Sequence, residues 1–141
     1  MTRVFVDTDI ILDLLAKRIP FYSFSAELFS LADKGKIQLC VSSLSLSNLN
    51  YILAKQYSTE QARKMLFKFK TLVQVLPVTD KTVELALSSD FKDFEDGMQY
   101  FTAIESDVAI LITRNLKDFR TAKIVVMTAE QFLKSHKGSG E

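Results

Sequence analysis

Acidic side chains recur where predicted strands end and predicted helices begin. Asp7 directly follows the β-rich run at residues 3–6, and Asp118 comes shortly after a second apolar run. Asp93 and Asp96 stand at the start of a predicted helix. Carboxylates gathered at one place repel one another, so a bound cation is their natural compensation. Oxygen ligands of this kind favour a hard divalent ion, Mg²⁺ or Mn²⁺.

The elements that must position these acids alternate between strands and helices. The apolar run at residues 108–113 (VAILIT) is typical of a strand buried on both faces. The other predicted strands span residues 3–6, 37–41, 73–78 and 124–127. Helical periodicity and capping residues predict helices between them. The pattern predicts an α/β fold, a parallel sheet of about five strands with helices on both faces. The working site of such a sheet lies off the carboxyl ends of its strands.

The length of the chain bounds its organisation. At 141 residues it suits one domain, and it contains no internal repeat and no linker long enough to divide it. We expect a single domain at residues 1–135, followed by a flexible C-terminal tail at residues 136–141.

Composition excludes several kinds of chemistry. A single cysteine, Cys40, rules out a disulfide framework and a thiolate zinc site, and the only histidine, His136, lies in the polar tail. A net charge of +1 provides no global basic field for nucleic acid. No apolar stretch reaches membrane-spanning length and no signal peptide is recognisable, so we expect a cytoplasmic protein that does not contact a membrane.

Each acid also has a plain structural interpretation. Asp7 could favour the positive end of a helix dipole, Asp93 or Asp96 could cap a helix, and Asp118 could belong to a turn. All of them fall at one rim of the predicted sheet, however, and this coincidence favours a metal site.

Four segments resemble the motifs of the PIN-domain family, in particular the toxin nucleases of bacterial toxin–antitoxin pairs. The first is VFVDTDIILDLL at residues 4–15, and the second is VSSLSLSNLNY at residues 41–51. The third is KDFEDGMQY at residues 92–100, and the fourth is ITRNLKDF at residues 112–119. The resemblance extends over residues 4–133 and implies a single PIN-like domain.

This resemblance assigns roles to individual residues. Asp7 and Asp96 match metal-binding acids of the family, and Thr113 matches a hydroxyl that orients the site. The family's fourth acid falls at Asn115, which is neutral, and Asp118 is the expected substitute.

Asn48 occupies the position where the family normally has a second acid, a glutamate. No glutamate occurs between Glu27 and Glu60, so no shift of the alignment restores it. An asparagine can offer a carbonyl oxygen but no negative charge. Asp93 or Glu95 could compensate from the helix of the third motif.

The implied activity is that of an Mg²⁺- or Mn²⁺-dependent endoribonuclease. Water activated by the metal would attack an RNA phosphodiester, with Asp118 and Asn48 positioning the water or the hydration shell of the ion. Arg114 and Lys117 are candidates for contacts with substrate phosphate. The resemblance also implies possible partners: RNA, an antitoxin protein and a second copy of the chain.

Other classes of protein remain open at this point. A catalytically weakened PIN domain would bind RNA or a protein without cutting. The segment V-F-V-D-T-D also fits the D-x-D of haloacid-dehalogenase-type phosphatases superficially, although the later acids lie in different contexts. A receiver-type signalling domain would need a phosphoacceptor aspartate after the third strand, where Asp80 is the expected start of a helix.

Overall fold

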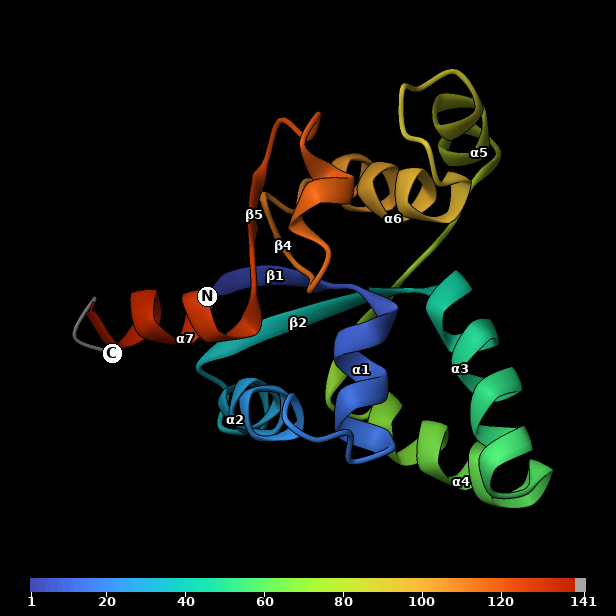
Figure 1. Cartoon of the computed structure of the whole chain (residues 1–141), viewed down its shortest axis with the longest axis vertical. Coiled ribbons are helices and arrows are strands. Elements are labelled where there is room, and N and C mark those ends of the chain that lie inside the picture. The colour runs from blue at the N-terminus through green and yellow to red at the C-terminus, as the bar shows by residue number, and fades with distance from the viewer. Residues whose placement is uncertain (139–141) are drawn as a thin grey trace.

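A computed structural model describes residues 1–138 and shows one parallel sheet with helices on both of its faces (Figure 1). The strands are β1 (Thr2–Val6), β2 (Ile37–Ser42), β3 (Val73–Leu76), β4 (Ile110–Ile112) and β5 (Val125–Met127). The helices are α1 (Thr8–Leu15), α2 (Tyr22–Asp33), α3 (Ser43–Gln56), α4 (Thr59–Lys70), α5 (Asp80–Leu87), α6 (Phe94–Glu105), the 3₁₀ helix η1 (Leu116–Phe119) and α7 (Ala129–Gly138). The predicted fold class is confirmed.

The strand order is β3-β2-β1-β4-β5, with every neighbouring pair parallel. The chain moves outward from β1 to β3 and then returns to place β4 on the other side of β1. Phe5 therefore lies in register with Cys40 on one side and with Leu111 on the other. In open α/β sheets the point where the order reverses is where ligands bind. Here that point is the exit of β1.

Alternating side chains divide the core into two layers. Val4 and Val6 of β1 point to the face covered by α1, α2, α3, α4 and α7, whereas Phe5 points to the face covered by α6 and η1. This alternation follows from the two-residue period of a strand. Because both faces are covered, Val4, Phe5 and Val6 are fully buried, and their packing positions the residue that follows them.

Three helices begin at the same rim with a side-chain cap. Asp7 caps α1, Ser42 caps α3 and Asp93 caps α6, each accepting a hydrogen bond from a backbone N–H of the first turn. Caps of this kind satisfy donors that the helix leaves unpaired. Helix capping alone therefore places these polar side chains at the rim.

Some predicted boundaries shift. The run at residues 108–113 gives a strand only at Ile110–Ile112, because Asp107 has a φ of 57° and the Val108 N–H bonds the Ala103 carbonyl in the turn after α6. At the other end, α7 continues through Gly138, three residues into the predicted tail, and residues 139–141 lie outside the described residues. None of the helices within residues 1–138 is long and apolar enough to cross a membrane.

Candidate active site at the carboxyl ends of the strands

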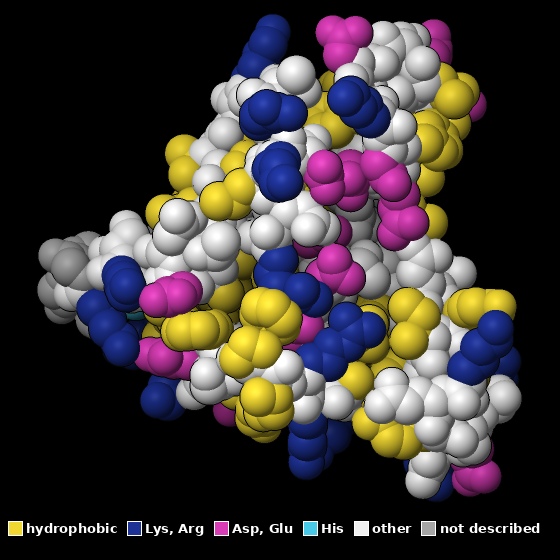
Figure 2. Space-filling model, viewed as in Figure 1, with side chains coloured by type: hydrophobic (Ala, Val, Ile, Leu, Met, Phe, Trp, Pro, Cys, Tyr) yellow, Lys and Arg dark blue, Asp and Glu magenta, His cyan; other side chains and the backbone are white. Residues whose placement is uncertain are grey.

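An acidic cleft of roughly 710 Å³ opens at the exit of β1. Asp7, Asp96 and Asp118 line it together, although they come from the β1 exit, α6 and η1. Asn48 of α3 lines the same cleft with Tyr51. In the space-filling view, acidic side chains gather around the hollow between the α6 and α3 sides of the molecule (Figure 2). The cleft contains the acids that the sequence predicted for one rim.

Asp7 is held on both carboxylate oxygens. Thr113 Oγ1 donates to Asp7 Oδ2 at 2.9 Å, and the Thr8 N–H donates to Asp7 Oδ1 at 2.8 Å. The residue is only 6% exposed, and this burial raises the pKa of its carboxyl while the hydrogen bonds from Thr113 and Thr8 oppose the rise. These hydrogen bonds hold the Asp7 carboxylate in place. None of the ion pairs within residues 1–138 gives it a basic partner.

Asp96 carries the most informative electrostatic signal. Partial burial, followed by the charges of Asp7, Asp93, Asp118 and Glu95, raises the pKa of its carboxyl to about 7. All of these neighbours carry the same sign, so none of them stabilises the ionised form. A raised acid pKa inside a cleft marks a functional-site candidate, because a cation bound there would lower that pKa again.

Asp93 has two roles in the structure. Its Oδ1 accepts from the Asp96 N–H at 3.0 Å as the cap of α6, and its side chain also lines the cleft. The structural interpretation of Asp93 as a helix cap and its prediction as a site residue are therefore compatible.

Asn48 contacts an acid across the cleft. Its Nδ2 donates to Glu95 Oε1 at 2.7 Å, which joins α3 to the start of α6. The neutral residue thus holds a carboxylate at the mouth of the cleft. The sequence predicted that Asp93 or Glu95 could compensate for Asn48, and Glu95 is the one that Asn48 contacts.

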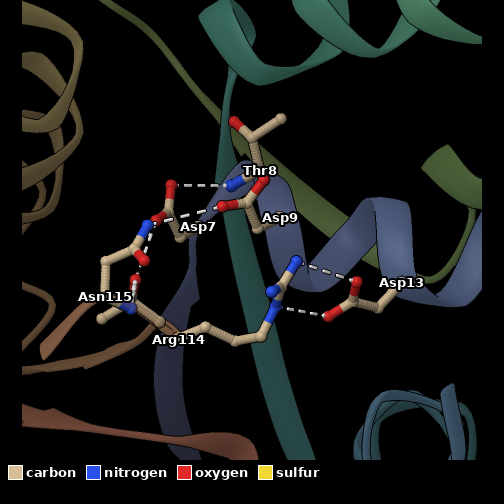
Figure 3. A network of polar contacts seen from close by, with 7 residues as sticks. Asp7, Thr8, Asp9, Asp13, Arg114 and Asn115 are labelled. Atoms are coloured by element: carbon tan, nitrogen blue, oxygen red, sulfur yellow. Dashed lines mark hydrogen bonds and ion pairs between the residues drawn. The ribbon is translucent and has the colours of Figure 1, made fainter. Parts of the chain in front are cut away.

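Thr113 and Asn115 support the site from the segment after β4, and Figure 3 shows Asn115 beside Asp7 and Asp9. The Thr113 hydroxyl, fully buried, also accepts from the Asn115 N–H at 3.1 Å. Asn115 Nδ2 lies 3.5 Å from Asp9 Oδ2. This amide therefore bridges the β4 exit to the first turn of α1, where Asp9 also lines the cleft.

Arg114 points away from the cleft (Figure 3). Its Nε and Nη2 donate to the two carboxylate oxygens of Asp13 at 3.0 and 3.2 Å, and its guanidinium stacks 4.0 Å from the Phe21 ring centroid. Asp13 is fully buried, so Arg114 serves as its counter-ion. The guanidinium is thus engaged by Asp13, and the contact between Arg114 and substrate phosphate stays a prediction.

Lys117 lies in a second hollow that adjoins the acidic cleft. The two share Asp93, Asp96 and Asp118 in their walls. Besides Lys117, the second hollow is lined by Lys92 and Arg120. Basic side chains thus flank the acids on one side.

The sequence analysis did not predict a buried polar network that lies behind Asp7. Its centre is Gln99 of α6, 1% exposed, whose amide hydrogen-bonds Thr8, Ser42 and Ser45. Gln99 stands three residues after Asp96, so both share one face of the helix. A polar residue at that spacing between the apolar positions of α6 was the available signal.

The donor set fits a hard divalent cation. The cleft presents carboxylate and amide oxygens with no sulfur or imidazole, which is the chemistry that Mg²⁺ and Mn²⁺ prefer. Among residues 1–138, no three acidic, histidine or cysteine side chains are placed so that they could hold a metal ion as they stand.

Comparison with known proteins identifies the family. Residues 3–117 match the PIN domain, which is most of the chain. The chain therefore belongs to the PIN-domain family. This membership replaces the phosphatase and receiver alternatives.

Similar proteins support the same assignment. Ribonuclease VapC1 from Aquifex aeolicus is 28% identical over 135 residues, covering 92% of each chain. VapBC2 from Rickettsia felis, solved with a DNA fragment from its promoter, superposes with a TM-score of 0.67 at 20% identity over 89% of this chain and 97% of that one. VapC20 from Mycobacterium tuberculosis, a toxin that cleaves the sarcin–ricin loop, has a TM-score of 0.66 at 18% identity over 86% and 96%. These structures share the fold.

Proposed function

We propose that this chain is a divalent-metal-dependent endoribonuclease of the toxin type. The proposal rests on the clustering of carboxylates in one cleft. Asp96 is half-buried there, and burial together with four neighbouring carboxylates raises its pKa to about 7. A divalent cation relieves that repulsion, and the similarity to ribonuclease VapC1 supports RNA as the substrate.

Asp7 and Asp96 would hold the ion, which we expect to be Mg²⁺ or Mn²⁺. Such an ion supplies Lewis acidity towards a phosphodiester and lowers the pKa of a bound water. Thr113 keeps one oxygen of Asp7 in place by its 2.9 Å hydrogen bond. The other oxygen is fixed by the Thr8 N–H, so Asp7 enters the reaction already oriented.

Four further residues complete the proposed machinery. Asp118 would orient the attacking water from η1, and Asp93 adds negative charge at the start of α6. Asn48 would contribute through Glu95, which it holds at 2.7 Å, so that the second acid reaches the cleft from α6. Asn115 would keep the β4 exit in place against Asp9.

RNA would approach across the hollow beside the cleft. Lys117, Lys92 and Arg120 line that hollow and would contact the backbone phosphates on one side of the scissile bond. We place Arg114 outside this proposed surface, because it pairs with Asp13.

The proposed biological setting is a toxin–antitoxin pair. Several structures of the same fold are toxin–antitoxin complexes, which supports a small antitoxin protein as partner. A homodimer is a further part of the proposal. An enzyme that acts on cellular RNA under such control would work in the cytoplasm.

A catalytically weakened PIN domain that binds RNA or protein is the second candidate. The neutral Asn48 and Asn115 favour it, because each occupies a position where the family has an acid.

Incubation of the purified chain with structured and single-stranded RNA would separate the two. The nuclease predicts cleavage with Mn²⁺ or Mg²⁺ and none with EDTA. Binding of RNA without cleavage under either metal would favour the second candidate.

A further inference from the structure

We propose that Gln99 is a positioning residue that sets the geometry of the metal-binding acids from behind the cleft. The inference rests on the proposed function, because it concerns how Asp7 and Asp96 are held relative to each other. Gln99 is almost fully buried and lines neither of the clefts described above, so it would act through its neighbours.

The Gln99 amide connects α6 with two parts of the chain that are distant from it in sequence, the junction of β2 and α3 and the first turn of α1. Its Oε1 accepts from Ser42 Oγ at 2.5 Å at the end of β2. Its Nε2 donates to Ser45 Oγ at 2.7 Å in the first turn of α3 and to Thr8 Oγ1 at 3.0 Å in the first turn of α1. One side chain of α6 is thereby tied to the starts of two other helices.

The same amide nitrogen faces Asp7. Gln99 Nε2 lies 3.4 Å from Asp7 Oδ1, beyond its two shorter contacts. The amide has two hydrogens, so Thr8 and Ser45 take the stronger bonds and Asp7 faces the positive end of the amide dipole. The hydroxyls are in turn linked, with Thr8 Oγ1 and Ser45 Oγ only 2.7 Å apart. The polar side chains behind Asp7 are therefore all hydrogen-bonded to one another.

Gln99 also determines where Asp96 stands. The two residues are three positions apart on α6 and share one helix face. Docking Gln99 against Thr8 fixes the face of α6 that presents Asp96 next to the end of β1 that presents Asp7. Partners that orient metal ligands from outside typically change metal affinity by about 10- to 100-fold when they are replaced.

The test compares Mn²⁺ affinity, measured by calorimetry, for wild type, Gln99→Met and Thr102→Val. Methionine keeps the length of the side chain but removes its hydrogen bonds. Thr102 is the matched control, since it is also fully buried on α6 but bonds only the Met98 carbonyl of its own helix. Both variants are expected to melt at lower temperature than wild type.

We expect Gln99→Met to weaken Mn²⁺ binding about tenfold or more, whereas Thr102→Val keeps the wild-type affinity. A Gln99→Met protein that binds Mn²⁺ as tightly as wild type would overturn the proposal, whatever its melting temperature. A wild type that binds no Mn²⁺ at all would instead contradict the proposed function.

A second measurement needs no variant. In the wild-type protein, the side-chain NH₂ resonances of Gln99 should shift as Mg²⁺ is added, because the charge on Asp7 beside them is being neutralised. Unchanged Gln99 resonances at saturating Mg²⁺ would also overturn the proposal.

Discussion

Asp13 and Asp96 are two acids with opposite electrostatic surroundings. Burial raises the pKa of both carboxyls. At Asp13 the guanidinium of Arg114 opposes that rise through a bidentate ion pair, although the pKa remains raised. At Asp96 the next contributions come from Asp7, Asp93, Asp118 and Glu95, and all of them raise the pKa further. The fold supplies a counter-ion for the structural acid and leaves the cleft acids to an external one.

Removing charge at Asp7 should have the largest effect. Asp7→Asn keeps the size of the side chain but loses the buried charge, so cleavage of RNA in Mn²⁺ should slow by about 10³-fold, the scale of losing a principal electrostatic contact. Single-turnover rates measure this. Glu84→Gln, which removes an exposed acid from α5 away from the cleft, is the control. Cleavage by Asp7→Asn at the wild-type rate would contradict the assignment.

Breaking the ion pair between Arg114 and Asp13 should have the second-largest effect. Arg114→Met leaves the fully buried Asp13 without its counter-ion, and we expect the free energy of unfolding to fall by about 3 kcal/mol. Denaturant unfolding measures the change, and Mn²⁺ should not restore it. The matched control is Lys64→Met, which breaks the exposed pair with Glu60 and should cost about 0.5 kcal/mol or less.

Asp96 should make the metal-free protein less stable as pH rises. The pKa of Asp96 in the folded state, about 7, lies above its ordinary value of 3.8, so the folded state favours the protonated form. The resulting stabilisation is complete below about pH 4 and is lost as pH rises towards 7 and above. After allowance for solvent screening at a half-buried group, we expect a loss of about 1–2 kcal/mol.

Comparison of wild type with Asp96→Asn isolates this contribution. Unfolding in EDTA at several pH values should show a steeper decline in wild type, because Asp7 and Asp13, whose pKa values are also raised, contribute in both proteins. Equal pH dependence in the two proteins would mean that the cleft carboxylates do not repel Asp96 as described.

The smallest effect should come from Lys117. Lys117→Ala removes a proposed phosphate contact, so RNA binding should weaken. The slope of the logarithm of the binding constant against the logarithm of the salt concentration should decrease in magnitude by about one. Lys64→Ala, on α4 and paired with Glu60, is the control and should leave both unchanged. An unchanged salt dependence in Lys117→Ala would remove the adjoining hollow from the RNA path.

The sequence predicted those features that depend on local order along the chain. Asp7 directly follows a strand and Asp93 directly precedes a helix, so the rim that they share followed from the alternation of elements. The five-stranded parallel sheet followed from the same alternation.

Features that depend on contacts between distant segments were not predictable in this way. Arg114 and Asp13 lie 101 positions apart, and only the fold shows that the arginine is occupied. Gln99 reaches Ser42 over 57 positions. Its spacing from Asp96 marked a shared helix face, but the partners behind that face come from three other elements, β2, α3 and α1.

Thermal unfolding with and without Mn²⁺ at neutral pH tests the central claim most directly. If the cleft acids lack only an external cation, Mn²⁺ at about 100 times its dissociation constant should stabilise wild type by about 2.7 kcal/mol and raise its melting temperature relative to EDTA. Asp7→Asn should show little or no rise. A wild type that melts at the same temperature in Mn²⁺ and in EDTA would contradict the account.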